Sequence, residues 1–462
     1  MDAGGPPDQI LGLIPYFVGG RQVNGDTLTV TSLGWLGSSR SAEYVWERCD
    51  AGGGGCLPIT NAAGPSYALT AADAGMRVRS IVMPTETGRR AIASSLLTGI
   101  VAAANPPAAP APYSLPSDAM LVSTSAELIA ALRRSHPRDI VLADGDYDSS
   151  GFFVNALGHR IYAQHLGGAV LRAGISVGGN LGRGGGLLRG LAFDVSDRDK
   201  TLGGAIVHVW GTGRDTRILD VVLDGHRAVG AGILVRRPEG AVVRRVAARN
   251  FLDVGIRVDA GELDYDVGTL PLVADVQVGN VGHDVPRSSN GTSEACVWIG
   301  NTAVVRRVRT RGCAWEGVWV GTAAHGALFE DIDVDESGVG VYAEHFVRDS
   351  VFRRVRAGPS TDRGITCEWA DPSWGRRPAC VDDVIEDSVF ESRVVGVLLD
   401  EGTVRTTVRR SAFVGQQAAA LGNYKGIDNL RDTSGNDYSR LGDGASRVTT
   451  LHYYEYAGRP AP

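Results

Sequence analysis

Three acidic residues occupy one position of a short motif that recurs in the second half of the chain. Glu344, Glu368 and Asp400 each stand four residues after a glycine, in G-V-Y-A-E (340–344), G-I-T-C-E (364–368) and G-V-L-L-D (396–400). Two carboxyl groups, one of which keeps its proton at neutral pH, can perform the acid–base chemistry that glycosidic-bond hydrolysis requires. These three residues are therefore the leading catalytic candidates. His345 and Glu401, each one residue beyond its motif, complete the candidate set.

The same motif recurs upstream, with cysteine replacing glycine in one copy. The earlier copies are G-I-L-V-R (232–236), G-I-R-V-D (255–259), C-V-W-I-G (296–300) and G-V-W-V-G (317–321). Successive copies start 23, 41, 21, 23, 24 and 32 residues apart. A period near 23 that is interrupted by two insertions indicates a solenoid whose coils each hold about three short strands.

Strand alternation assigns each motif position to a face. The first and third residues after the glycine are mostly aliphatic and should point inward, so the second and fourth should point outward. The acids would then stack at the coil spacing of about 4.8 Å, and repulsion should raise the pKa of the central one, Glu368. Acids on adjacent coils suit a retaining mechanism, whereas Glu344 with Asp400 suits an inverting one. Both stay open, as does a structural or calcium-binding role for the stack.

Three aromatic residues occupy successive copies of the other outward position. Trp298, Trp319 and Tyr342 follow Arg257 in that column, and Asp259 lies beside it. Sugar rings stack on aromatic side chains, so we expect these residues to form binding subsites along a groove. The alternative is that the insertion 260–294 covers the two tryptophans as a satellite core.

A second insertion follows directly after Glu368 and should form a wall of the same groove. Spanning residues 369–381, it carries further candidate binding residues, namely Trp369, Asp371, Trp374 and Arg376.

Paired charges also recur on a different strand family of the repeat. Arg353/Arg354 and Arg409/Arg410 alternate along the chain with Glu330/Asp331 and Glu386/Asp387. We interpret these residues as a structural face, on which arginines of one coil pair with acids of a neighbouring coil.

The repeat resembles the right-handed parallel β-helix of pectate lyases, polygalacturonases and other polysaccharide-active proteins. The resemblance covers residues 118–440 and concerns architecture, with a helix that begins at the capping box Thr124–Glu127 covering the first coil. The short motifs that identify pectate lyases are missing, so no catalytic residue of that family is transferred to this chain.

The first 101 residues form a different unit, for which the sequence predicts short strands separated by glycine and proline turns. W-E-R-C-D-A-G-G-G-G-C (46–56) and Y-A-L-T-A-A-D-A-G-M-R-V-R (67–79) resemble the immunoglobulin-like repeat appended to many exported actinobacterial proteins. The alanine- and proline-rich stretch that follows has the composition of an extended linker. The predicted organisation is an all-β chain with an Ig-like β-sandwich at 1–101, a linker at 102–117, a β-helix at 118–440 and a tail at 441–462.

Six cysteines fall into three near pairs, none with the C-x-x-C spacing of a zinc or redox site. We expect the disulfides Cys49–Cys56, Cys296–Cys313 and Cys367–Cys380, with buried free thiols as the alternative. Disulfides indicate export to the cell surface or medium. Export needs a leader peptide, which the first five residues do not resemble, so we expect that it has been removed.

The amino-acid composition limits the kinds of partner that we expect for this protein. The net charge of −6, from 46 basic and 52 acidic residues, argues against nucleic acid, and no apolar run approaches the ~18 residues of a membrane span. The 62 glycines among 462 residues, well above the usual share of about 7%, suit a chain with many turns. The sequence leaves open whether homotrimers form, as in some β-helix proteins.

The sequence thus favours an exported glycoside hydrolase that acts on a poly- or oligosaccharide and needs no cofactor. Three alternatives remain: a polysaccharide lyase or epimerase that uses calcium, a fructan transferase, and a non-catalytic glycan-binding adhesin. Hydrolysis is preferred to elimination because the motif column is acidic and neither lysine, Lys200 or Lys425, lies in it.

Overall fold

A computed structural model describes most of the chain. The described residues are 17–19, 24–25, 27–31, 42–51, 55–84, 93–94, 101, 115–134, 136, 138–154, 158–178, 185–201, 203–210, 214–259, 269–282, 295–300, 302–321, 324–344, 346–368, 380–400, 403–423 and 430–450.

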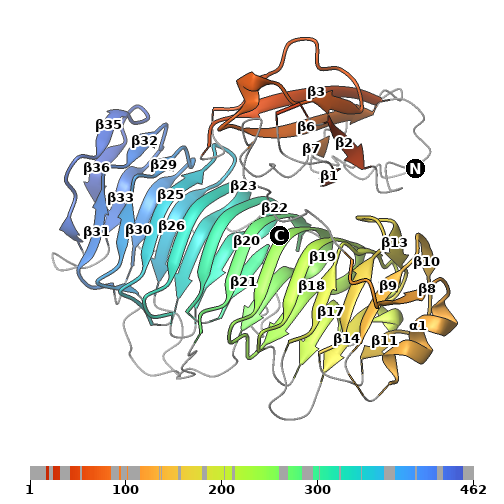
Figure 1. Ribbon diagram of the computed structural model, residues 1–462. Helices are drawn as coiled ribbons and strands as arrows, with labels where there is room; N and C mark the ends of the chain where they lie inside the picture. Colours follow the sequence, from red (N-terminus) through yellow and green to blue (C-terminus); the bar gives the residue numbers. More distant parts are fainter. Residues whose placement is uncertain are drawn as a thin grey trace, which may run out of the picture.

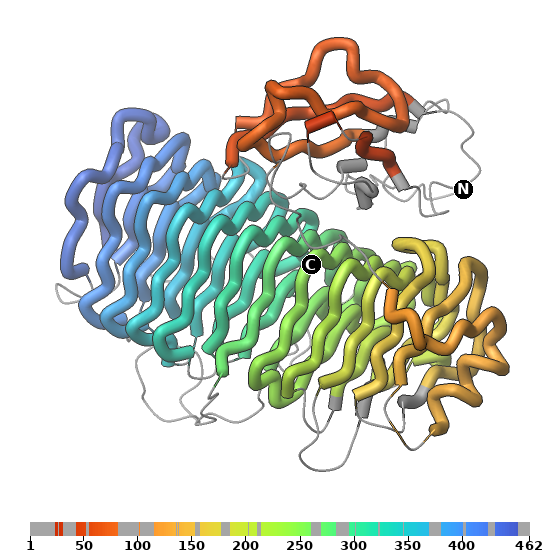
Figure 2. The backbone as a smooth tube through the Cα atoms, in the orientation of Figure 1, coloured from red at the N-terminus to blue at the C-terminus, as the bar shows by residue number. Residues whose placement is uncertain are grey.

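From residue 120 onward the chain winds into a solenoid in which each strand pairs in parallel with a strand of the next coil (Figures 1 and 2). Short strands form the first coils: β8 (Met120–Val122), β9 (Asp139–Leu142), β10 (Gly145–Tyr147), β11 (Phe152–Val154), β12 (Arg160–Ala163), β13 (Ala169–Leu171), β14 (Ile175–Gly178), β15 (Leu187–Arg189), β16 (Ala192–Asp194) and β17 (Ala205–Trp210).

The middle coils contain long strands that bend around the solenoid. The long ones are β18 (Arg217–Arg236), β19 (Val242–Asp259), β22 (Val304–Val320) and β23 (Leu328–Glu344); β20 (Leu272–Val281) and β21 (Val297–Ile299) are shorter. The last coils contain β24 (Val347–Arg348), β25 (Val351–Ala357), β26 (Arg363–Glu368), β27 (Cys380–Val381), β28 (Val384–Glu386), β29 (Val389–Phe390), β30 (Val395–Leu399), β31 (Thr406–Arg409), β32 (Ala412–Val414), β33 (Ala419–Asn423), β34 (Leu430–Asp432), β35 (Asp437–Arg440) and β36 (Ser446–Thr449).

The interior of the solenoid is one continuous hydrophobic core. Aliphatic side chains alternate with outward polar ones along each strand, and aromatic rings stack from coil to coil. Phe329 and Phe352 lie 4.9 Å apart, and Phe390 and Phe413 lie 5.3 Å apart, between ring centroids. Because a single coil cannot bury its inward face, this stacking is what holds the coils together.

One corner of the solenoid carries a charge of alternating sign on eight successive coils. We call these residues the corner ladder; each has a φ between +50° and +58°, and they are Asp220, Arg245, Asp275, Arg307, Asp331, Arg354, Asp387 and Arg410. A left-handed residue bends the strand sharply, which explains how β22 and β23 pass the corner without ending.

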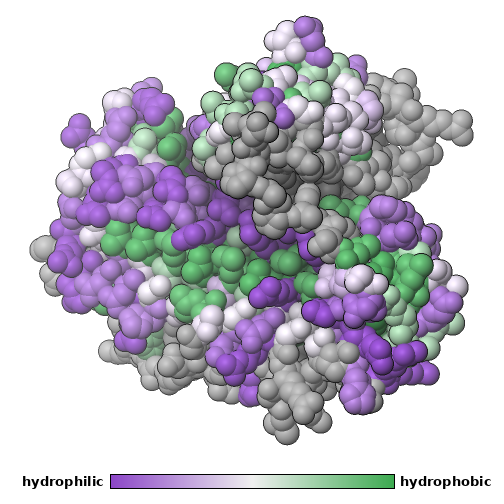
Figure 3. All heavy atoms as spheres, in the orientation of Figure 1, coloured by the Kyte–Doolittle hydropathy of each residue, from purple (hydrophilic) through white to green (hydrophobic). Residues whose placement is uncertain are grey.

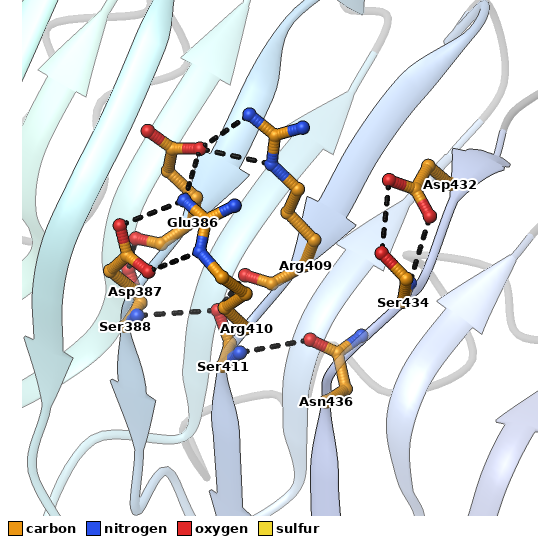
Figure 4. A network of polar contacts seen from close by, with 9 residues as sticks. All are labelled: Glu386, Asp387, Ser388, Arg409, Arg410, Ser411, Asp432, Ser434 and Asn436. Carbon is orange, nitrogen blue, oxygen red and sulfur yellow. Dashed lines mark hydrogen bonds and ion pairs between the residues drawn. The ribbon is translucent and has the colours of Figure 1, made fainter.

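The ion pairs expected between neighbouring coils are confirmed. Arg354 contacts Asp331 at 2.6 Å and Arg353 contacts Glu330 at 2.6 Å. In the next pair of coils, Arg409 and Arg410 both contact Glu386 at 2.8 Å, and Arg410 also contacts Asp387 (Figure 4). Because the sign alternates from coil to coil, neighbouring charges attract each other, whereas identical charges at this spacing would repel.

Helix α1 (Ser125–Leu132) precedes the second strand of the solenoid. Its N-cap is Thr124, whose side chain accepts a hydrogen bond from the backbone of Glu127 while the Glu127 carboxylate accepts one from the backbone of Thr124. Leu128 and Leu132 belong to the same hydrophobic core as the solenoid strands, so the helix packs against the first coils. It is too short to cross a membrane, and no described helix is long and apolar enough to do so.

The N-terminal part contains two small antiparallel sheets around their own core. Their strands are β1 (Phe17–Gly19), β2 (Thr27–Thr31), β3 (Ala42–Cys49), β4 (Leu57–Pro58), β5 (Ser66–Ala68), β6 (Arg77–Pro84) and β7 (Ala93–Ser94), together with the 3-10 turn η1 (Ala71–Asp73). Trp46 is fully buried in this core beside Tyr67, and its indole N–H donates to the carbonyl of Gly64. A second 3-10 turn, η2 (Arg198–Lys200), lies within the solenoid.

All three expected disulfides are present: Cys49–Cys56, Cys296–Cys313 and Cys367–Cys380. The last two pairs are buried in the solenoid core. The solenoid also continues past residue 440, where the sequence analysis ended it, because β36 pairs in parallel with β33.

The surface of the solenoid is banded along its axis. In the view of Figure 3, a strip of more hydrophobic residues runs along the coils with hydrophilic residues on both sides. Such bands follow from the repeat, since equivalent positions of successive coils lie next to each other.

Candidate functional site

The three candidate acids lie next to one another on successive coils, as the repeat predicted. Glu344, at the end of β23, is the register partner of Glu368, at the end of β26. Cys367 pairs with Leu399, which places Asp400 beside Glu368. We call Glu344, Glu368 and Asp400 the acid column. These strands run side by side along one sheet of the solenoid (Figure 1).

Glu368 is the central member of the acid column and is buried beside both other acids. Only 4% of the residue is exposed, and the Tyr342 hydroxyl donates a 3.0 Å hydrogen bond to its Oε2. Burial raises the pKa of Glu368 to about 9, and the charges of Asp400 and Glu344 push it in the same direction, against the opposing effects of Tyr342 and Arg363. The side chain therefore holds a proton at neutral pH, as the sequence predicted for this member of the column.

Glu344 has a different environment. It is partly exposed, and the indole N–H of Trp319 donates a 2.9 Å hydrogen bond to its Oε2. Asp400 is 2% exposed, and its backbone N–H bonds the carbonyl of Cys367 at 2.8 Å. The column thus places a protonated carboxyl between two further acids.

Two glycines of the same column create room for neighbouring side chains. A Cβ at Gly321 would lie 2.4 Å from the Cη2 of Trp319, so the indole ring covers this glycine. A Cβ at Gly300 would lie 2.2 Å from Oδ1 of Asp259. Glycine at these two positions lets the Trp319 ring and the Asp259 carboxylate lean along the column.

Arg257, Trp298 and Asp259 form a compact group beside the acid column. The guanidinium of Arg257 lies 3.6 Å from the centre of the Trp298 ring and bonds the Asp259 carboxylate at 2.6 Å. Trp298 in turn meets Trp319 edge-to-face, with ring centroids 4.4 Å apart. Arg257 and Trp298 are partly exposed, whereas Asp259 is buried.

The aromatic residues do not form an open row on the surface. Trp319 and Tyr342 are 6% and 8% exposed, and they pack in a second hydrophobic cluster outside the solenoid core, with Val339, Val395 and Leu398. The alternative interpretation, a satellite core, is therefore correct as to burial, but the cluster is built mainly from strand residues of neighbouring coils and contains no described residue of the insertion 260–294. The side chains are buried because large apolar rings on neighbouring coils reach each other, and their polar atoms are turned towards the acids.

Several sequence candidates lie outside the described residues. These are His345, Glu401, Trp369, Asp371, Trp374 and Arg376. Within the described part of the chain, no group of three or more His, Cys, Asp and Glu side chains is arranged to hold a metal ion.

The sequence analysis missed two charged residues on the same face. Glu316 and Arg363, 5% and 4% exposed, occupy the position just before the glycine of their motifs. Their column also contains Val339 and Val395 of the satellite cluster, so this position faces outward as well. The signal was present in the sequence, since E-G-V-W and R-G-I-T place a charge where other copies have an apolar residue.

Comparison with known proteins shows similarity in structure alone. No known family model matches the chain, and no curated protein matches its sequence.

Two similar structures are catalytic domains of GH87 α-1,3-glucanase variants in complex with nigerose. Both have a TM-score of 0.52 and cover 94% of this chain and 91% of their own, at 12% and 11% identity. An alginate lyase from Paenibacillus sp. str. FPU-7 has a TM-score of 0.36 and 14% identity, and covers 72% of this chain and 99% of its own. Together with the parallel register of successive coils, the two glucanase domains show that the chain has the right-handed parallel β-helix fold.

Proposed function

We propose that the protein is an exported carbohydrate-active enzyme that hydrolyses glycosidic bonds of a poly- or oligosaccharide. The observation that carries the proposal is Glu368, a buried carboxyl group with a pKa raised to about 9 between two other acids. A carboxylic acid that stays protonated beside an ionised one is the arrangement that glycoside hydrolysis uses.

In the proposed reaction, the Glu368 O–H protonates the glycosidic oxygen as its bond to the anomeric carbon breaks. The Glu344 carboxylate either attacks the anomeric carbon, forming a glycosyl ester that water then hydrolyses while Glu368 takes up the proton of that water, or takes a proton from a water that attacks the anomeric carbon directly. Glu344 suits this role because it is partly exposed and its orientation is held by Trp319. Asp400 contributes its negative charge, which helps Glu368 to keep its proton before the substrate is bound.

We infer that the substrate is a neutral glycan. Glu344 and Asp400 lie on one side of the aromatic column, so a uronate carboxylate placed there would be repelled. The partly exposed Arg257 and Trp298 offer a planar surface with hydrogen-bond donors at its edge, which suits the apolar face and hydroxyls of a sugar. Two proteins of similar fold are α-1,3-glucanase domains bound to nigerose, which makes neutral α-glucans a sensible first test.

The test is a reducing-end assay across neutral and acidic glycans, with the ultraviolet absorbance of unsaturated products read in parallel. We expect new reducing ends without absorbance. Glu368→Gln keeps the size of the side chain but removes the acid, and should lower turnover by about 100-fold or more while glycan binding persists.

A matched control is Asp383→Asn. Asp383 is another fully buried carboxyl, with a pKa raised to about 8 by burial, but it lies away from the acid column and bonds the backbone N–H of Ser350. Its replacement should leave turnover within about two-fold. Unsaturated products would identify a lyase, and binding without cleavage would favour the adhesin; either result overturns the hydrolase proposal.

Export and domain organisation belong to the same proposal. Three disulfides are typical of proteins that fold outside the cytosol. We propose that the two small N-terminal sheets are an immunoglobulin-like module, joined by a linker to the β-helix, and that α1 covers the first coil.

A further inference from the structure

Arg363 occupies an unusual position on the face that carries the acid column. It begins β26, the strand that ends at Glu368, and its register partners on the adjacent coils are Val339 and Val395. Both valines belong to the satellite hydrophobic cluster, and Arg363 itself is only 4% exposed. A guanidinium therefore stands between two valines of this column, where most other copies of the motif have an apolar side chain.

A buried guanidinium is costly unless acids balance its charge. Glu316 lies in the same column two coils earlier, and Glu368 lies on the same strand. The groups that act on Glu368 are Tyr342 and Glu344 from β23, Asp400 after β30, and Arg363. Tyr342, whose hydroxyl donates to Glu368, packs in the same satellite cluster as Val339 and Val395, the register partners of Arg363, so Arg363 and Glu368 border one cluster. Glu344 and Asp400 raise the pKa of Glu368, whereas the Tyr342 hydrogen bond and then the charge of Arg363 lower it.

We propose that Arg363 is a positioning residue that stabilises the carboxylate formed when Glu368 gives up its proton. This inference rests on the proposed function of Glu368 as the acid. Proton donation leaves a new negative charge in a buried site between two other acids, which opposes the transfer. A fixed positive charge on the same face reduces that penalty as the charge develops, so it acts on the transition state more than on the bound substrate.

The experiment measures the pH dependence of thermal unfolding for four proteins: the wild type, Arg363→Met, Glu368→Gln and the double variant. In Arg363→Met, Glu368 should stay protonated to higher pH, so the loss of stability with rising pH should extend up to about 1 pH unit further than in the wild type. In the Glu368→Gln background, Arg363→Met should leave the shape of the pH profile unchanged.

Two further variants separate charge from structure. Arg363→Lys keeps the cation and should restore the wild-type profile. Arg393→Met removes an exposed arginine that pairs with Asp362, outside the acid column, and should change no pH dependence. If Arg363→Met does not fold, Arg363→Gln replaces it in the same cycle.

The stability cycle needs no substrate, so it tests Arg363 separately from the hydrolase proposal. Absence of glycan cleavage would defeat the proposed function and leave the cycle intact. An unshifted profile for Arg363→Met, or an equal shift with and without Glu368, overturns the assignment. Where an active glycan is found, the alkaline limb of the pH profile of kcat/KM should move to higher pH in Arg363→Met. In the same variant, the relative decrease in kcat should exceed the relative change in KM.

Discussion

Glu368 holds its proton mainly because it is buried, and only then because of its neighbours. Removal from water disfavours the charged carboxylate, and the charges of Asp400 and Glu344 add to that effect. The sequence analysis placed the repulsion first, because stacking is visible in a repeat and burial is not. The distinction matters for chemistry, since a buried acid stays protonated even when one neighbour is neutralised by substrate or solvent ions.

The same residue should make the protein less stable as the pH rises. The folded-state pKa of about 9 lies above the unfolded value, so the folded state binds the extra proton between roughly pH 4.5 and 9. Stability is therefore greatest below that window and falls through it, by at most about 1.4 kcal/mol per pH unit for this group. Chemical unfolding across this range should show a shallower decline for Glu368→Gln. Identical slopes for the two proteins contradict the assignment.

At the scale of the elements, the coil-to-coil register decides what each side chain can reach. Trp319 extends over Gly321 and so brings its N–H to Glu344 on the next coil. The corner ladder follows the same rule with charges, since each arginine pairs with an acid in the coil before it. A strand in this fold is thus positioned by its two neighbours, and a small change in one coil acts on a side chain of another.

Gly321→Ala tests this dependence directly. The added methyl group would meet the Trp319 ring at 2.4 Å, so the indole must move and its hydrogen bond to Glu344 should be lost. We expect a change in the near-ultraviolet circular dichroism of the tryptophans and a loss of turnover of about 10-fold or more, with the fold retained. Gly64→Ala is the control for turnover, because its Cβ would have an ordinary 3.7 Å contact with the backbone oxygen of Ser66 in the N-terminal part of the chain. Unchanged turnover and spectrum in Gly321→Ala would show that Trp319 does not orient Glu344.

At the scale of the whole molecule, one disulfide connects the two sides of the insertion that follows Glu368. The Cys367–Cys380 bond spans residues 369–379 and begins directly before Glu368. Cys49–Cys56 lies in the N-terminal part of the chain and connects the end of β3 to the residue before β4. The two disulfides are chemically alike, but we expect their removal to affect turnover differently.

Replacing both Cys367 and Cys380 by serine should lower the free energy of unfolding by about 2–4 kcal/mol and reduce turnover. Replacing Cys49 and Cys56 should leave turnover unchanged. Equal activity losses in the two double variants would mean that the Cys367–Cys380 bond has no special role at the site. Denaturant unfolding and the reducing-end assay measure the two effects separately.

The sequence alone determined the parts of this protein that follow from repetition. The spacing of the motif predicted parallel coils, and the alternation within it predicted which residues face outward. Cysteines close in sequence predicted the disulfides, and opposite charges one period apart predicted the ion pairs between coils. These predictions were correct because residues that are neighbours in space in a solenoid occupy equivalent positions one period apart in the sequence.

Only the tertiary structure decided what surrounds each outward side chain. It showed that Trp319 and Tyr342 are buried and aimed at the acids, that Arg363 lies on the same face, and that Gly300 and Gly321 provide space for their neighbours. The physical reason is that burial, and with it the pKa of Glu368, depends on everything packed around a residue in three dimensions, whereas a repeat records only the direction in which its side chain points.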